Sequence, residues 1–307
     1  VDALCYQAKN VADVIKDCDI VLDTNVLLLP YNSGTTTFTS IITTLQKYDT
    51  NKKLFIPSQV AREFIRNRPV KISDLHQSLS DKISKLNVPD QINYPILIGL
   101  EKYEQLNEVL EKTKSAIKVI GNANLELLEL IRSWEWNDPV YKEYKSLFTK
   151  DNIIDIKIDK EALVADLARR KKLCIPPGYK DSTKDDYGIG DLLIWKTILS
   201  IGEKNKRDLV FISGEEKADW QHRSGNSGLM PRYELVDEYR RISNGKTFFI
   251  IQLSKFLELS SNDNAVVEEV RQEELRLNEA TNVSITCPSC NYIFSWHLAE
   301  FFGASSK

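Results

Sequence analysis

The chain has 307 residues, of which 42% are hydrophobic and 28% charged, which is typical of a globular protein and argues against disorder. Its length fits one elaborated domain, or one domain with a small appendage, better than two full domains. The net charge of −3 argues against a protein that coats nucleic acid non-specifically, because such binding needs a basic surface. Any contact with nucleic acid must therefore be local.

In the stretch 20–67, strands are expected to alternate with helices. The run at 20–29 (IVLDTNVLLL) is expected to form a buried strand, interrupted by polar residues at 23–25. Helical spacing follows at 38–48, and a second short strand at 54–56 is closed by Pro57. A helix is then expected over 59–67, with Ser58 as its N-cap and Pro69 limiting its extent.

Residues 72–150 are expected to form a long helical insertion. Apolar residues recur at helical spacing on both sides of a turn that Pro89 and Pro95 mark. The part at 101–130 is rich in charge and is predicted to be an exposed helical arm. Its apolar positions are more often used for packing within a helical hairpin than for binding a partner, although a protein partner there stays open.

Beyond the insertion, strands and helices alternate again. We expect a small strand at 153–158, a helix at 161–171, a loop at 175–181 and an apolar helix at 192–201 that Gly190 and Asp191 open. Strands at 209–212 and 247–253 and a last short helix follow. This order predicts an α/β fold, namely a three-layer α/β/α sandwich with a central parallel sheet, a long helical-hairpin insertion and a small C-terminal appendage. The expected domains are 1–260 and 261–307.

Four carboxylates lie near the predicted ends of the strands. Asp23 and Glu215 follow strands, Glu63 lies on the helix after the second strand, and Asp191 starts the helix before the third. In open α/β sheets, ligands bind outside the carboxyl ends of the strands, so the fold would gather these acids. Clustered carboxylates usually hold a hard cation, so Mg²⁺ or Mn²⁺ and phosphodiester hydrolysis are expected. Any one of these acids alone is more often an N-cap or a solvated charge.

Five segments in chain order resemble the PIN-like nucleases, in particular a branch with a long helical insertion. The segments are VLDTNVLL, PSQVAREFIRN, IPPGYKD, GIGDLLIW and VFISGEEKADW. The resemblance covers about residues 20–259, and the ordered combination of DTN after a strand with the GDLLIW helix start is its specific part. It implies an α/β/α sandwich and metal-dependent endonucleolysis, usually of RNA. It also makes Asp23, Glu63 and Asp191 the first three metal ligands, with Asn25 in support.

The fourth acidic ligand stays open. Similar proteins often carry Thr-Asp-Asp after the strand, whereas this chain has Ser213, Gly214 and Glu215. Glu215 keeps the charge, and Asp219 and Asp181 are further candidates. By the same resemblance, Ser213 would hydrogen-bond a carboxylate or a metal-bound water.

Local basic residues would have to hold the phosphates of a substrate. The candidates are Arg62, Arg66, Lys180, Lys217 and Arg223, with Arg68 and His222 nearby. Each is as often an ordinary surface residue. Trp220 is expected in the core rather than stacked on a base. The GNSG run at 225–228 is typical of a flap or of a simple turn.

The C-terminal element carries a CxxC pair. Cys287 and Cys290 have the spacing of half a zinc ribbon, but no second CxxC follows. A truncated ribbon, a zinc site completed by another chain and two ordinary thiols are the alternatives. The charged run at 266–279 is expected to be a linking helix.

The leading hypothesis is an endoribonuclease, which the resemblance implies acts as a toxin or an antiviral defence effector. A DNA or flap nuclease is one alternative, because metal-assisted hydrolysis does not distinguish the sugar. Another is a catalytically weak module that binds nucleic acid, or a protein through the arm or the C-terminal element. Scattered, odd-numbered cysteines and apolar runs shorter than the ~20 residues of a membrane span favour a cytoplasmic protein. No signal peptide is visible, and the start at Val1 suggests that residues precede it.

Overall fold

The computed structural model describes residues 7, 9–87, 93–179, 188–214, 219–224, 227–286 and 293–297. For 227, 279–286 and 293–297 only the backbone is described. Contacts group the chain into two compact units. We call Val1–Arg66 with Glu143–Lys307 the sheet unit, and Asn67–Lys142 the insertion unit. The predicted insertion at 72–150 therefore overlaps an observed unit that begins and ends several residues earlier.

A five-stranded parallel sheet forms the centre of the sheet unit, in the order β3-β2-β1-β4-β7. Its strands are β1 (Asp19–Leu22), β2 (Leu54–Pro57), β3 (Ile153–Ile154), β4 (Leu209–Ile212) and β7 (Phe248–Ile251). All residues of β1 and β4 are buried, as expected for strands covered on both faces. The central strand β1 pairs Val21 with Phe55 on one side and with Phe211 on the other.

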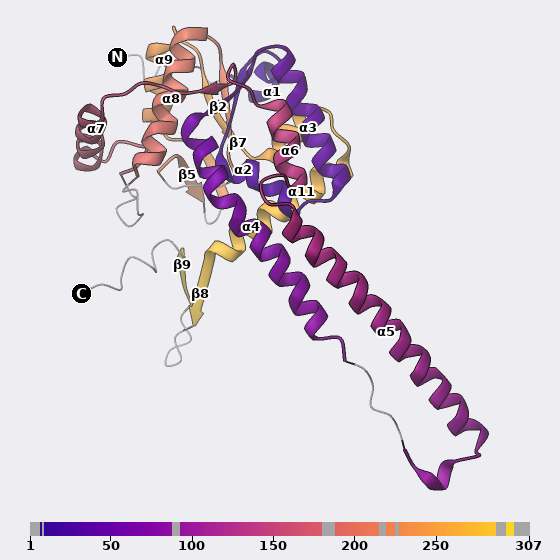
Figure 1. The fold of residues 1–307 in the computed structure, drawn as a ribbon. Coiled ribbons are helices and arrows are strands. Elements are labelled where there is room, and N and C mark those ends of the chain that lie inside the picture. The colour runs from indigo at the N-terminus through magenta and orange to yellow at the C-terminus, as the bar shows by residue number, and fades with distance from the viewer. Residues whose placement is uncertain are drawn as a thin grey trace. The chain divides into compact units, whose positions relative to one another are not determined.

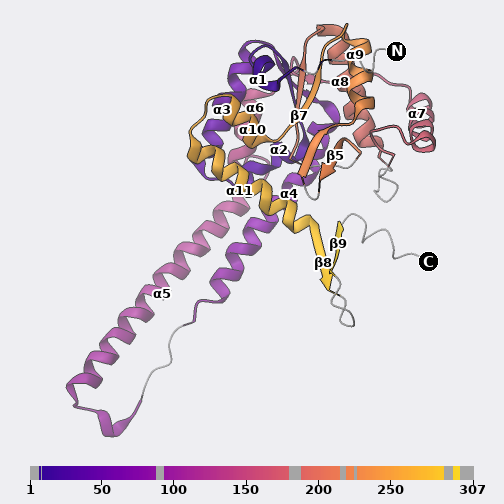
Figure 2. The same ribbon diagram turned by 180° about the vertical axis from the view of Figure 1, so that it is seen from behind.

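Helices cover both faces of this sheet, which confirms the predicted three-layer sandwich. Figures 1 and 2 both show α8 and α9 on one side of the sheet, and α3 and α11 on the other. The helices of this unit are α1 (Val11–Val14), α2 (Thr24–Leu28), α3 (Thr35–Thr50), the first part of α4 (Ser58–Ser84), most of α6 (Pro139–Leu147), α7 (Lys160–Leu173), α8 (Ile189–Asn205), α9 (Tyr233–Ile242), α10 (Leu253–Leu259), α11 (Asn264–Thr281) and the 3-10 turn η2 (Leu29–Asn32).

Aromatic side chains fill the layer between α8 and the sheet. Trp195 of α8 is fully buried and makes edge contacts with Phe248 of β7 and with Trp220, at centroid distances of 5.0 and 5.9 Å. Gly202 lets α8 approach α9, because a Cβ there would lie 2.4 Å from the ring of Tyr239. Trp220 is thus a core residue, as the sequence predicted.

Three expectations about local structure were wrong or incomplete. Only 19–22 of the first apolar run is a strand, because the chain turns into α2 directly after Asp23. The antiparallel hairpin of β5 (Gln221–Ser224) and β6 (Ser227–Pro231) and the helix α9 were not anticipated. The first two residues of the GNSG run lie outside the described residues, so a flap or a turn there stays a prediction. The run at 266–279 lies in α11, which packs against α3 and α10 rather than only linking them to the C-terminus.

Side chains of α11 hold two other helices of the sheet unit. Glu269 accepts hydrogen bonds from the Thr37 hydroxyl and from the backbone N–H of Gly34, at the start of α3. The buried Glu274 accepts the N–H groups of Leu253 and Ser254, at the start of α10. Free N–H groups at a helix start favour such carboxylates. Beyond α11, β8 (Asn282–Thr286) and β9 (Ile293–His297) pair as a hairpin.

The insertion unit contains the second part of α4, the 3-10 turn η3 (Pro95–Leu97) and the 33-residue helix α5 (Glu101–Ser133). The expectation that Pro69 limits the first of these helices was wrong, since α4 runs through it to Ser84. A proline inside a helix removes one hydrogen bond and costs about 3 kcal/mol.

Among the described helices, none is long and apolar enough to cross a membrane.

A buried arginine beside Pro69 holds this part of α4. The guanidinium of Arg68 pairs with the carboxylate of Asp138 and donates to the carbonyl of Glu135 at 2.9 Å. It also lies over the rings of Trp136 and Tyr141, 5.2 and 4.8 Å from their centroids. Arg68 is 1% exposed, so it is a structural residue of the insertion unit, and the expectation that it could contact a substrate was wrong.

We predict that Asp138→Ala lowers the free energy of unfolding by about 3–5 kcal/mol, because it leaves the charge of Arg68 buried without its partner. Urea unfolding followed by circular dichroism measures this change. The matched control is Asp151→Ala, which removes an exposed carboxylate and should shift the free energy by less than about 0.5 kcal/mol. Equal stability of the two variants would contradict the structural role of the pair.

Candidate functional site

Asp23 ends the central strand and starts a helix. Its backbone N–H still bonds to Ile212 of β4 at 3.0 Å, and its side chain caps α2. One carboxylate oxygen accepts the N–H of Thr24 at 2.7 Å, and the other accepts the Ser213 hydroxyl at 2.7 Å. Asp23 is only 5% exposed. The carboxylate is therefore held in one orientation at the edge of the sheet where ligands bind in α/β folds.

Thr24 connects Asp23 to Glu63. Its backbone donates to Asp23, and its hydroxyl donates to Oε2 of Glu63 at 2.6 Å. The other oxygen of Glu63 accepts the side-chain amide of Gln59, one helical turn earlier on α4, at 2.8 Å. The structure thus joins two of the predicted acids through one intervening residue.

The end of β4 lies against the start of α2. Ser213 donates to Asp23, and the N–H of Gly214 donates to the side-chain oxygen of Asn25 at 3.0 Å. A Cβ on Gly214 would lie 3.6 Å from the Asn25 amide, so the two segments are in contact. Asp23 and Asn25 therefore both contact the segment 213–214 that leads to Glu215, and Glu215 itself lies outside the described residues.

Asp191 lies in the first turn of α8, as predicted, and is 7% exposed. Gly188 is the N-cap of this helix and has a φ of 83°, a left-handed conformation that suits glycine. Asp219 is also buried, and one of its oxygens accepts the N–H of Gly178 at 2.8 Å. That oxygen ties the proline-rich loop to the segment before β5.

The described residues do not by themselves complete a metal centre. Within them, no three His, Cys, Asp or Glu side chains are grouped closely enough to hold a metal ion. The candidates Asp181, Glu215, Lys180 and Lys217 lie outside the described part of the chain, as do Cys287 and Cys290 between β8 and β9. The predicted fourth acid and the predicted zinc pair thus stay predictions.

Two residues that the sequence reasoning missed lie close to the predicted acids. Thr24 stands directly after Asp23, and Gln59 precedes Glu63 by four positions on one helix face, so spacing was a signal for Gln59.

Asp155 follows β3 and accepts the Ser58 hydroxyl at 2.5 Å. That hydrogen bond, helped by Arg62, lowers the pKa of Asp155. Ser58 is the first residue of α4 rather than the expected N-cap before it.

The predicted substrate-binding arginines differ in their surroundings. Arg62 is exposed and forms an ion pair with Asp155 at 3.2 Å, and such pairs are weak enough to exchange for a phosphate. Arg66 is exposed on the same helix. Arg223 on β5 is half-buried, and its Nε has no hydrogen-bond partner in the described structure. His222 beside it is exposed.

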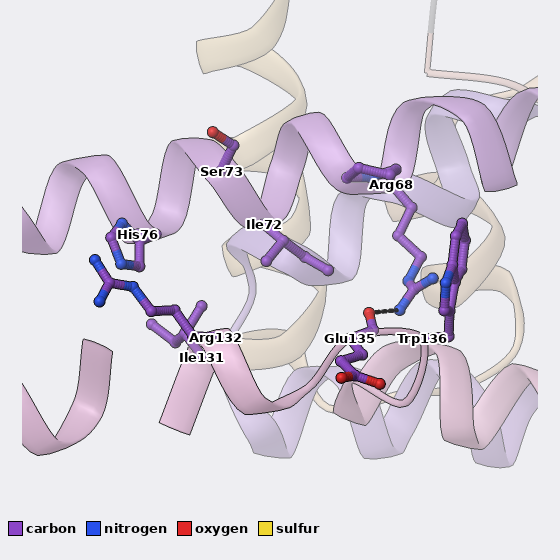
Figure 3. Close-up of a pocket in the computed structure, with 9 residues that line it drawn as sticks. Arg68, Ile72, Ser73, His76, Ile131, Arg132, Glu135 and Trp136 are labelled. Atoms are coloured by element: carbon purple, nitrogen blue, oxygen red, sulfur yellow. Dashed lines mark hydrogen bonds between the residues drawn. The ribbon is translucent and has the colours of Figure 1, made fainter. Parts of the chain in front are cut away.

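A separate cavity of about 610 Å³ lies within the insertion unit (Figure 3). Figure 3 shows Arg68 donating to the backbone of Glu135, beside the ring of Trp136. His76 also borders the cavity, and its Nε2 is buried without a hydrogen-bond partner in the described structure. The remaining lining residues are Pro69, Ile72, Ser73, Ile131 and Arg132. The cavity contains none of the predicted acids.

Comparison with known proteins identifies one related family. A family model described as a PIN like domain matches residues 19–235, which include four of the five strands of the sheet. Neither the curated proteins nor the solved structures gave a match.

We predict that Asn25→Ala speeds hydrogen exchange at the Gly214 amide about 5- to 10-fold, because a typical hydrogen bond is worth about 1 kcal/mol. Amide exchange followed by NMR measures this rate. Asn51→Ala, whose amide bonds to a distant helix end, serves as the control and should leave Gly214 unchanged. An unchanged rate in Asn25→Ala would mean that the Asn25 side chain does not protect this amide.

Proposed function

Because the chain belongs to the PIN-like domain family, whose members are generally nucleases, we propose that it is a divalent-metal-dependent endonuclease that hydrolyses RNA. The membership rests on a match over residues 19–235, which contain every acid of the proposed site. The fold is the expected α/β/α sandwich. Metal use, the choice of RNA and the catalytic residues are part of the proposal.

One observation carries the proposal most directly. The carboxylates of Asp23 and Glu63 are linked through Thr24 at the carboxyl edge of a parallel sheet, and Ser213 from the next strand fixes Asp23. Three segments that are far apart in sequence thus meet in a hydrogen-bonded group of two acids. A carboxylate that only caps a helix or carries surface charge would not be expected to have hydrogen-bond partners from two other segments.

The proposed metal ligands are Asp23, Glu63 and Asp191, completed by Glu215 or Asp219. Their donor atoms are all carboxylate oxygens, the type that Mg²⁺ and Mn²⁺ prefer, so the residues fit such an ion in kind. When bound, a divalent ion stabilises charge on the phosphoryl oxygens and lowers the pKa of a water. Asp219 accepts the Gly178 N–H with one oxygen and Glu215 lies outside the described residues, so both stay candidates for the fourth ligand.

The chain's own polar groups would orient this set. Ser213 and the Thr24 N–H hold the two oxygens of Asp23, and the Thr24 hydroxyl and Gln59 hold those of Glu63. Residues that bond a ligand from behind commonly change metal affinity 10- to 100-fold when they are removed. Arg62, Arg66 and Arg223, with Lys180 and Lys217, would bind substrate phosphates.

The cellular part of the proposal is a toxin or antiviral defence effector that cuts RNA. A catalytically weak module that binds nucleic acid or a protein is the second candidate. It is favoured by the segment after β4, which has Ser213, Gly214 and Glu215 where similar proteins often carry Thr-Asp-Asp. A DNA or flap nuclease is tested alongside.

We predict that Asp23→Asn lowers the cleavage rate at least about 100-fold while preserving the fold, because an amide cannot replace a metal-binding carboxylate. Cleavage of labelled single-stranded RNA with Mn²⁺ measures the rate, and calorimetry measures Mn²⁺ binding. The control Asp151→Asn removes an exposed carboxylate outside the site and should keep full activity. Equal activity of wild type and Asp23→Asn would rule out this active site.

We further predict that Ser213→Ala weakens Mn²⁺ binding about 10-fold, with activity recovered at saturating Mn²⁺. Its role is to position Asp23, so the loss should appear in metal affinity rather than in the rate at saturation.

DNA of the same sequence provides the test of substrate class, and equal cutting of RNA and DNA would remove the RNA assignment. Mn²⁺ binding without cutting of either would favour the binding module.

A further inference from the structure

One face of α4 borders the cavity of the insertion unit. Arg68, Ile72 and His76 follow one another at intervals of four residues, so they lie on one face of the helix and span about 12 Å along it. Ile131 and Arg132, near the end of α5, border the same cavity (Figure 3). Every lining residue belongs to the insertion unit, so the cavity is a feature of that unit alone.

The wall of the cavity at Arg68 is fixed in place. The guanidinium of Arg68 pairs with Asp138 and donates to the carbonyl of Glu135. It also lies over the rings of Trp136 and Tyr141. These contacts hold α4 against the turn that follows α5, so the cavity exists before any ligand arrives. A preformed site loses little free energy to ordering when a ligand binds.

Two polar side chains at the other end of the cavity lack partners. In Figure 3, His76 and Arg132 lie at the end away from Trp136. The Nε2 atom of His76 is buried without a hydrogen-bond partner, and the guanidinium of Arg132 forms no ion pair or hydrogen bond in the part of the chain that the structure describes. A buried polar atom without a partner destabilises a fold. This pair of groups is therefore suited to a ligand that supplies the missing acceptor.

The remaining walls are largely apolar. Ile131 is buried and Ile72 is half-buried, while the ring of Trp136 is 57% exposed and free to contact a flat group. Apolar walls with a few polar groups are typical of small-molecule sites, which measure about 300–1,000 Å³. The volume of about 610 Å³ lies in that range. The cavity thus has the size and the lining of a site for a small organic molecule.

The charges of the lining residues favour an anion at the His76 end. The charge of Arg68 is balanced by Asp138, whereas that of Arg132 is not balanced within the described residues. Glu135 is the one carboxylate among the lining residues, and Figure 3 shows it near Trp136, at the opposite end. A guanidinium binds phosphate and carboxylate groups equally well in geometry, through paired N–H donors.

We infer that this cavity binds a small organic anion with a flat apolar body. Its phosphate or carboxylate group binds Arg132 and the Nε2 of His76, and its body lies between Ile72 and Ile131, towards Trp136. The site contains none of the proposed metal ligands. The inference therefore stands or falls independently of the proposed nuclease activity.

Isothermal titration calorimetry of the full chain tests the ligand class with naphthyl phosphate, naphthoate, naphthol and inorganic phosphate. At least one of the two naphthyl anions should bind at least about tenfold more tightly than both naphthol and inorganic phosphate, because only these anions contact both parts of the site. The tighter of the two identifies the preferred anionic group. Failure of both anions to bind, or equally tight binding of naphthol, overturns the inference.

Variants of the two unpartnered residues test where the anion binds. Arg132→Ala should raise the dissociation constant of the tighter anion at least about tenfold, because it removes a charge-assisted hydrogen bond. His76→Leu should weaken binding in the same way, yet raise the melting temperature, because it removes a buried nitrogen that has no partner in the free protein. An unchanged dissociation constant in either variant, or a lower melting temperature in His76→Leu, contradicts the assigned roles.

Lys118→Ala is the matched control, since it removes an exposed cation of the same helix about 21 Å from Arg132. It should change the dissociation constant less than about twofold. NMR adds a direct readout, because the ring signals of His76, assigned by their loss in His76→Leu, should shift on titration with the tighter anion. A control that weakens binding as much as Arg132→Ala, or His76 signals that stay in place, overturns the inference.

Discussion

The arrangement of the proposed site depends on how β1 and β4 pair in the centre of the sheet. Leu22 lies opposite Ile212, so the residues that follow, Asp23 and Ser213, leave the sheet together and form a hydrogen bond. A shift of the pairing by one residue would turn the side chains of a strand to the other face. In the observed register, with Leu22 opposite Ile212, the Ser213 hydroxyl lies against the Asp23 carboxylate. Thr24 then extends the group to Glu63 on α4.

Much of the fold was predictable because a buried parallel strand has a simple signature. The runs that became β2, β4 and β7 are short, apolar and bounded by polar or turn residues, and each was expected within two residues of its observed limits. The helix start at Asp191 was expected for the same kind of local reason. Pro69 misled because a proline usually ends a helix, whereas here the helix continues past it beside the buried Arg68.

The parts of the site that could not be predicted involve partners distant in sequence. Nothing local distinguishes Arg68 from its neighbours Arg62 and Arg66, and only the fold brings Asp138 to it. Likewise, nothing local in the DTN motif indicates that the Thr24 hydroxyl donates a hydrogen bond to Glu63 of α4. Helix α5 is the reverse case, because its helical spacing is readable in the sequence and the structure has one helix over Glu101–Ser133.

The layer that α10 and α11 add to the sheet has a practical consequence for where this protein can be divided. The family match ends at residue 235, inside α9 and before β7. A fragment that ends at that boundary would lose the edge strand β7. The backbone groups of β4 would then be unpaired and open to pairing with another chain. A fragment that ends at 260 would keep β7 but lack α11. It would lose the hydrogen bonds that Glu269 accepts from Thr37 and that Glu274 accepts from Leu253. The smallest piece that keeps these contacts runs through α11 to Thr281.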